Sequence, residues 1–161
     1  MPTLLEAIAG VPNACQILPS LVAGGQPSKM HLVRLRAAGC QLICDLRDPG
    51  ERWFFDEAET VTGLGLEYVN VPVTPRTIND TTLERVRRLL RANGERGMFL
   101  HCAGGNRAGA TLLPYLILDC ELGEEDALTL AARAGLSSRD LLAWAMRYVQ
   151  RMKDSERSGG G

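Results

Sequence analysis

A cysteine and an arginine with four residues between them form the part of this sequence best suited to chemistry. Residues 98–110 read Met-Phe-Leu-His-Cys-Ala-Gly-Gly-Asn-Arg-Ala-Gly-Ala, so a loop containing two glycines joins Cys102 to Arg107. An ionised cysteine is a strong nucleophile. The planar guanidinium of arginine binds two oxygens of a phosphate or a related oxyanion. The segment therefore combines a nucleophile with an anion clamp.

The residues around Cys102 predict a strand, a loop and a helix. An apolar run ends at His101, and the pattern becomes helix-compatible from Arg107 onward. Glycines allow the loop to bend so that successive N–H groups face one concavity, and the helix N-terminus adds a partial positive charge. We expect these donors to favour the thiolate of Cys102. The predicted oxyanion-binding residues are Ala103, Gly104, Gly105, Asn106 and Arg107.

Three segments of the chain together resemble a known enzyme family. They are Gly25-Gln26-Pro27-Ser28, Cys44-Asp45-Leu46-Arg47 and the run 101–109. The last segment resembles the signature of cysteine-dependent protein tyrosine and dual-specificity phosphatases. All three are similar to a bacterial phosphatase-like family related to the accessory domain of beta-lactamase hydrolase-like proteins. The resemblance covers roughly residues 15 to 120 and implies a cysteine-phosphatase-like fold.

The resemblance also implies a reaction and a substrate class. Cys102 would attack the phosphorus of a phosphomonoester, and water would hydrolyse the resulting phosphocysteine. Loop amides and Arg107 would stabilise the charge on the transferred group. The expected substrate is a phosphorylated protein or a small phosphomonoester, and the expected mechanism uses no cofactor and no metal.

The general acid of the dual-specificity relatives is not at its expected place in this chain. Those relatives carry an aspartate a few residues after a strand and a proline, where this sequence has Thr74 and Pro75. Asp80 is the nearest carboxylate, although Asp80 or Thr81 also suits helix capping, and Thr81 with Glu84 fits a capping box. We therefore expect the enzyme to favour aryl phosphates such as phosphotyrosine, whose leaving groups need less protonation.

Two features keep other chemistries open. Most phosphatases of this kind have five residues between cysteine and arginine, whereas rhodanese-type sulfurtransferases have four, as this chain does. Ala108 stands where phosphatases commonly have Ser or Thr. A sulfurtransferase would carry a persulfide on Cys102, and Arg107 would orient a donor such as thiosulfate. A binding module that holds phosphate without turnover is the third alternative.

The composition predicts one soluble domain. The chain has 161 residues, of which 45% are hydrophobic and 23% charged, as in globular proteins that bury a core. We expect a domain over residues 1–154 and a disordered, polar, glycine-rich tail over 155–161. The net charge of −1 predicts neither a nucleic-acid nor a membrane partner. No apolar run approaches the ~20 residues of a spanning helix, and no secretory pattern begins the chain, so the expected location is cytoplasmic.

Alternating strands and helices predict an α/β fold with a mainly parallel central sheet flanked by helices, followed by further C-terminal helices. The expected strands are 17–22, 41–46, 66–71 and 98–101, and the expected helices are 28–38, 57–63, 81–93, 107–119 with a bend at Pro114, 123–134 and 138–152. Such a sheet places the Cys102 loop at its carboxyl edge. There, four polar residues could border the pocket, although loop solvation and a charge at a helix N-terminus are the more ordinary roles for each of them: Asp45, Arg47, Asp48 and Glu51.

Two further groups of residues extend beyond this site. Four arginines on the helix 81–93, at positions 85, 87, 88 and 91, suit either an acidic partner or, more ordinarily, a solvated helix face. Five cysteines, at 15, 40, 44, 102 and 120, form no CxxC pair and are expected to be reduced. Cys44 could form a protective disulfide with Cys102 if their Cα atoms lie within roughly 7 Å. His101 and Cys102 should point to opposite sides of a strand, which argues against a shared metal.

Overall fold

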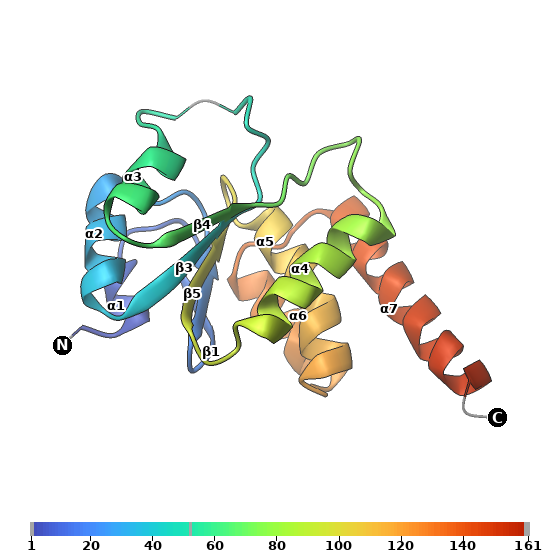
Figure 1. Cartoon of the computed structure of the whole chain (residues 1–161). Coiled ribbons are helices and arrows are strands. Elements are labelled where there is room, and N and C mark those ends of the chain that lie inside the picture. The colour runs from blue at the N-terminus through green and yellow to red at the C-terminus, as the bar shows by residue number, and fades with distance from the viewer. Residues whose placement is uncertain (1, 52, 160–161) are drawn as a thin grey trace.

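Five strands form the sheet at the centre of the molecule, in the order β1-β2-β5-β3-β4 (Figure 1). The structure is a computed structural model that describes residues 2–51 and 53–159. The strands are β1 (Cys15–Leu18), β2 (Leu21–Gly24), β3 (Cys40–Asp45), β4 (Glu67–Asn70) and β5 (Gly97–His101). β1 and β2 pair antiparallel, and the other neighbouring strands pair parallel. The predicted α/β fold with a mainly parallel sheet is confirmed.

Helices cover both faces of the sheet (Figure 1). One face carries α1 (Leu4–Ala7), α2 (Lys29–Ala37) and α3 (Glu57–Gly63); the other carries α4 (Asp80–Ala92), α5 (Asn106–Pro114), the π-helix η1 (Tyr115–Asp119), α6 (Glu124–Arg133) and α7 (Arg139–Gly159). Because successive strand side chains point to opposite faces, the central strands contribute side chains to both of the hydrophobic cores that flank the sheet. Ile43 and Phe99 pack with α1–α3, whereas Cys44 and Leu100 pack with α4–α7.

The helix expected over 107–119 with a bend at Pro114 is instead two segments, because α5 ends at Pro114 and η1 follows. Proline has no N–H and disturbs the helix around it, and here the chain changes from α-helix to the π-helix η1 directly after it. The N–H of Cys120 accordingly bonds to the carbonyl of Tyr115, five residues earlier, at 3.0 Å. None of the helices within residues 2–51 and 53–159 combines the length and the apolarity needed to cross a bilayer.

Three sequence predictions need correction. The single strand expected at 17–22 is a hairpin, because Pro19 and Ser20 turn the chain between β1 and β2. The cap of α4 is Asn79, whose side chain accepts the N–H of Thr82 at 3.0 Å, so the Thr81 capping box is wrong. The disordered tail predicted for 155–161 is wrong for residues 155–159, which continue α7; residues 160–161 lie outside the described residues.

Candidate active site

Cys102 directly follows β5, which lies between β2 and β3 at the centre of the sheet. The loop from Cys102 to Gly105 leads into the N-terminus of α5 (Figure 1). Cys102 is 1% exposed, and its backbone N–H donates to Gly24 O of β2 at 3.3 Å. The predicted sequence of strand, loop and helix is confirmed.

The carbonyls of the loop bond to groups outside it. Ala103 O accepts the N–H of Gln26 at 2.9 Å, and Gly104 O accepts the side-chain amide of Asn13 at 2.8 Å. Inside the loop, the N–H of Gly105 donates to the sulfur of Cys102 at 3.1 Å. This donor stabilises a thiolate, because hydrogen bonds to a charged form favour that form.

A side chain would not fit at position 105, whereas there is room for one at position 104. Gly105 has φ +111°, and a Cβ at this position would lie 2.0 Å from Ala134 O in the turn between α6 and α7. Gly104 has open space where its Cβ would be. Gly25 allows a second close approach, since a Cβ there would lie 2.6 Å from Ala103 O. The loop is therefore packed closely against two neighbouring segments.

The side chain of Asn106 ties the loop to the start of α7. Its Oδ1 accepts the N–H groups of Ser137 and Ser138 at 2.6 and 2.8 Å, and its Nδ2 donates to Ser137 Oγ at 3.2 Å. The predicted contact between Asn106 and an oxyanion would therefore come from its backbone N–H.

The guanidinium of Arg107 is held by Glu51. Nη1 and Nη2 donate to the two carboxylate oxygens at 2.7 and 2.9 Å, and Nη1 also lies 3.5 Å from Val73 O. The hydrogen bond to Glu51 raises the pKa of Arg107, and the neighbouring Cys102 raises it further against the opposing effect of burial. The same ion pair lowers the pKa of Glu51. Arg107 is thus positioned beside Cys102, and the carboxylate of Glu51 already binds the two N–H groups of its guanidinium.

A network of buried charges lies beneath the loop. The ring of His101 is fully buried; Nε2 lies 2.5 Å from a carboxylate oxygen of Glu57, and Nδ1 lies 3.1 Å from Cys102 O. Arg47 binds both oxygens of Asp45, at 3.0 and 2.9 Å, and lies 3.5 Å from Glu57. Burial alone would lower the pKa of His101, but the hydrogen bond and charge of Glu57, together with Asp45, outweigh it and raise that pKa.

This network also contains the side chains that come nearest to a metal-binding set. Ligand atoms of Asp45, Glu57 and His101 all lie within 4.8 Å of one another. The guanidinium of Arg47, however, already binds both carboxylates. A cation would have to displace that guanidinium. Asp45, Glu57 and His101 are therefore better suited to stabilising the fold beneath the loop. The sequence missed this role for Glu57, which reads as an ordinary acid in the first turn of a helix.

A cavity of about 500 Å³ lies at the carboxyl edge of the sheet. Asp45, Arg47, Asp48 and Glu51 line it, but Cys102 and Arg107 do not, so a pocket that these four residues share with the cysteine loop stays a prediction. Its wall also includes aromatic rings, from Trp53, Phe55 and Tyr68. Because Glu51 both lines the cavity and binds Arg107, it connects the cavity to the cysteine loop.

Two residues weighed for chemical roles are engaged elsewhere. Asp80 begins α4 and forms an ion pair with Arg151 of α7. Cys44 pairs with Leu100 in the sheet, two residues before Cys102, so one strand spacing and two residues of rise separate the two Cα atoms by about 8 Å. A disulfide would require backbone movement at that separation. Burial also raises the pKa of the Cys44 thiol, which suits a packing role.

Comparisons with known proteins support the fold. No protein-family model and no curated protein matches the sequence. A DUF442 protein of Shewanella putrefaciens CN-32, assigned as a phosphatase, matches with TM-score 0.77 and 20% identity over 91% of this chain and 97% of that chain. Tk-PTP in its active form matches with TM-score 0.72 and 19% identity over 87% and 98% of the two chains.

A third solved structure contains a ligand. A cysteine-to-serine variant of TpbA from P. aeruginosa, in complex with phosphotyrosine, matches with TM-score 0.65 and 19% identity over 85% of this chain and 82% of that chain. At identities of about 20%, these matches show that the proteins share a fold. The chain has the fold of tyrosine-phosphatase-like proteins, as the cysteine-phosphatase-like resemblance implied.

Proposed function

We propose that this chain is a cysteine-dependent phosphatase that hydrolyses phosphomonoesters. The observation that carries the proposal is the donation from the N–H of Gly105 to the sulfur of Cys102 at 3.1 Å, in a loop that leads directly to Arg107. Donors around a thiolate can equally surround the oxygens of a phosphate that the thiolate attacks. The shared fold and the phosphotyrosine complex of TpbA support this assignment.

The reaction would proceed in two displacements. The thiolate of Cys102 attacks phosphorus, a P–S bond forms, and the P–O bond to the leaving group breaks. Water then attacks the phosphocysteine, the P–S bond breaks, and phosphate leaves as the thiolate returns. Loop amides and Arg107 stabilise the charge on the equatorial oxygens in both steps.

Substrate binding would exchange one anion for another at Arg107. Glu51 presents two oxygens to the guanidinium, and a phosphate group offers two oxygens of similar spacing. Cys102 is 1% exposed while this ion pair is present. Displacement of Glu51 by substrate would free the guanidinium for the phosphate oxygens.

The leaving group is expected to be aryl. Thr74 and Pro75 stand where the relatives carry their acid, and Asp80 is paired with Arg151. A phenolate leaves without full protonation, whereas an alkoxide does not. Phosphotyrosine in a protein or peptide is accordingly the substrate that we propose.

The four-residue interval between Cys102 and Arg107 is the observation that favours a sulfurtransferase instead. In that reaction the thiolate attacks the outer sulfur of thiosulfate, an S–S bond to Cys102 forms, and sulfite leaves with the electron pair of the broken S–S bond. The persulfide then passes its outer sulfur to a nucleophilic acceptor such as cyanide. A binding module without turnover would not need the cysteine, so the presence of both residues counts against it.

Phosphate release from p-nitrophenyl phosphate, measured from about pH 5 to 8 under reducing conditions, tests the proposal. Turnover should disappear in Cys102→Ser and persist in Cys120→Ser. Cys120 is a suitable control because it follows η1, which continues α5, and so lies at the far end of these two helices from Cys102 and Arg107. Absence of release from the folded, reduced native protein would overturn the proposal. Formation of thiocyanate from thiosulfate and cyanide, dependent on Cys102, would then establish the alternative.

A further inference from the structure

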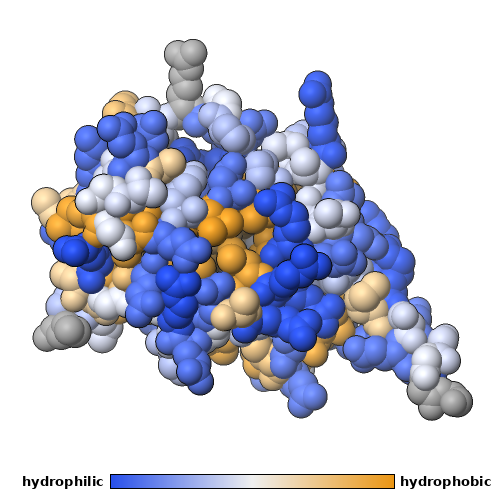
Figure 2. Space-filling view, in the orientation of Figure 1, coloured by the Kyte–Doolittle hydropathy of each residue, from blue (hydrophilic) through white to orange (hydrophobic). Residues whose placement is uncertain are grey.

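A groove of about 340 Å³ lies between the sheet and α4, and its lining does not include the residues of the cysteine loop. Val69 and Val71 of the β4 segment and Leu89 of α4 contribute apolar side chains to it, and Arg85 and Arg88 contribute cations. Figure 2 shows a hollowed apolar area near the centre of this face, bordered by hydrophilic surface. The combination of apolar side chains and arginines is typical of a binding surface rather than of a solvated helix face.

One side of the groove is the free edge of the sheet. β4 is the last strand in the strand order, and among the strands of the described part of the chain it pairs with β3 alone. The N–H of Val71 points toward β3, where it donates to Asp45 O at 3.0 Å. Backbone groups alternate between the two edges of a strand, so those of Tyr68 and Asn70 point away from β3. An edge of this kind can accept an additional strand from another chain.

The arginines of α4 divide into two pairs. Arg87 and Arg91 both face Asp119, with nitrogen–oxygen distances of 2.6 and 3.6 Å. Arg85 and Arg88 line the groove instead, and within residues 2–51 and 53–159 neither forms an ion pair. Three positions apart on a helix, they lie on the same face. The groove therefore presents two neighbouring positive charges that the fold itself does not neutralise.

We propose that this groove binds an extended acidic segment of a partner protein, which adds to β4 as a further strand. Side chains two positions apart in an extended segment lie on the same face, about 7 Å apart. One apolar side chain can then contact Val69 and Leu89 while Asp or Glu two positions away reaches Arg85 or Arg88. A second copy of this chain fits less well, because a two-fold contact through β4 would bring its own arginines to the same groove.

The groove leads toward the candidate active site. The chain leaves β4 through Val71 and reaches Val73, whose carbonyl lies 3.5 Å from Arg107 Nη1. A docked partner would therefore have its neighbouring residues close to the cysteine loop. This last consequence rests on the proposed phosphatase function, whereas binding of the acidic segment does not.

Fluorescence anisotropy with a labelled peptide tests the proposal. The probe has a central Leu with Thr on either side of it and Glu two positions away from it. The comparison peptide has Lys in place of Glu. The native protein should bind the Glu peptide and not the Lys peptide. Arg85→Glu/Arg88→Glu should weaken binding of the Glu peptide by at least about tenfold and bind the Lys peptide instead. Arg34→Glu/Arg36→Glu, on α2 at the other face of the sheet, should behave like the native protein.

Two further measurements are needed. One distinguishes strand pairing from simple charge attraction, and the other distinguishes binding of a partner from dimerisation of this chain. Methylation of alternate peptide amides should abolish binding, because it removes the N–H groups that pair with β4. Equal affinity of the Glu peptide for the native protein and for Arg85→Glu/Arg88→Glu would overturn the proposal. Sedimentation showing a native dimer that this double variant dissociates would also overturn it, since a second copy would then cover the groove.

Discussion

Arg107 and Glu51 are joined by two parallel hydrogen bonds, of 2.7 and 2.9 Å, across 56 positions of sequence. Carboxylate and phosphate present similar pairs of oxygens to a guanidinium, so the two anions compete for the same fork. The side chain of Glu51 is 36% exposed, and solvent screens a pair in such a position. The effect of this pair should therefore be greater on ligand binding than on folding.

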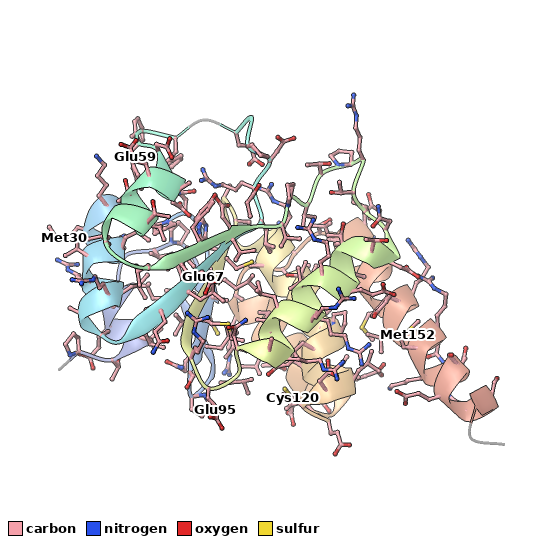
Figure 3. All side chains as sticks on the ribbon, viewed as in Figure 1. Met30, Glu59, Glu67, Glu95, Cys120 and Met152 are labelled. Atoms are coloured by element: carbon pink, nitrogen blue, oxygen red, sulfur yellow. The ribbon has the colours of Figure 1, made fainter. Side chains whose placement is uncertain are left out.

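Replacement of Glu51 by Gln should tighten the binding of inorganic phosphate. The substitution removes the competing charge while keeping the size of the side chain. A gain of about fivefold in affinity corresponds to the ~1 kcal/mol at the upper end for exposed ion pairs. Calorimetric titration with phosphate measures it, with Glu59→Gln, an exposed acid on α3 (Figure 3), as the control. Weaker binding in Glu51→Gln would show that Glu51 orients Arg107 rather than competing for it.

Replacement of Gly105 by Ala should destabilise the protein far more than the same change at Gly104. At Gly105 the new methyl group meets Ala134 O at 2.0 Å and the backbone has φ +111°, whereas at Gly104 the space is open. Left-handed strain and overpacking together cost about 2–4 kcal/mol, and a change in open space costs less than about 1 kcal/mol. Urea unfolding of the two variants gives the comparison. Equal losses of stability would contradict the tight packing of the loop against the turn after α6.

The same loop shows how much of the site the sequence determines. The apolar run before Cys102, the glycines and the helix-compatible pattern after Arg107 are local constraints, and each predicted the observed backbone. The partners of these residues are not local. Glu57 lies 44 positions from His101, and Glu51 lies 56 from Arg107, so only the packing of α3 and of the β3–α3 loop brings them together.

The errors in predicting the cap of α4 and the end of α7 have local causes. Asn79 and Thr81 are both good caps, and the side chain of Asn79 reaches the free N–H of Thr82. The end of α7 looks disordered by composition, yet side chains one turn apart interact along it. Gln150 bonds to Asp154 at 3.0 Å, and Asp154 pairs with Arg157 at 3.5 Å. Such contacts favour the helix over the coil by a few tenths of a kcal/mol each.

Replacement of Glu57 by Gln should destabilise the protein much more than Glu67→Gln. Glu57 neutralises His101 and Arg47 in the protein interior, and breaking a buried ion pair costs about 3–5 kcal/mol. Glu67 on β4 pairs with Arg96 at the surface, where a pair contributes about 1 kcal/mol or less (Figure 3). Denaturant unfolding at neutral pH measures both. Similar losses would mean that the buried network contributes little to the fold.

The pH dependence of stability should reveal the charge on His101. Its pKa in the folded protein is raised above the ordinary value of 6.5. The resulting stabilisation is complete below about pH 6.5, the pKa in the unfolded chain, and is lost as pH rises through the folded pKa. The native protein should therefore lose stability on the alkaline side of this window, and Glu57→Gln should show a flatter profile. Unfolding curves at a series of pH values measure it, and parallel profiles would contradict a charged His101.

Two substitutions of Asn106 should separate folding from anion binding. Asn106→Ala removes the acceptor of the Ser137 and Ser138 N–H groups and should cost about 1–2 kcal/mol of stability, with phosphate affinity retained in the folded protein. Asn106→Asp keeps an acceptor for both groups, so stability should stay close to native. It also adds a negative charge at the first residue of α5, which should weaken phosphate binding several-fold because like charges repel at a helix N-terminus that holds an anion. Urea unfolding and calorimetric titration measure the two effects separately. Unchanged phosphate affinity in Asn106→Asp would mean that the anion does not bind at the N-terminus of α5.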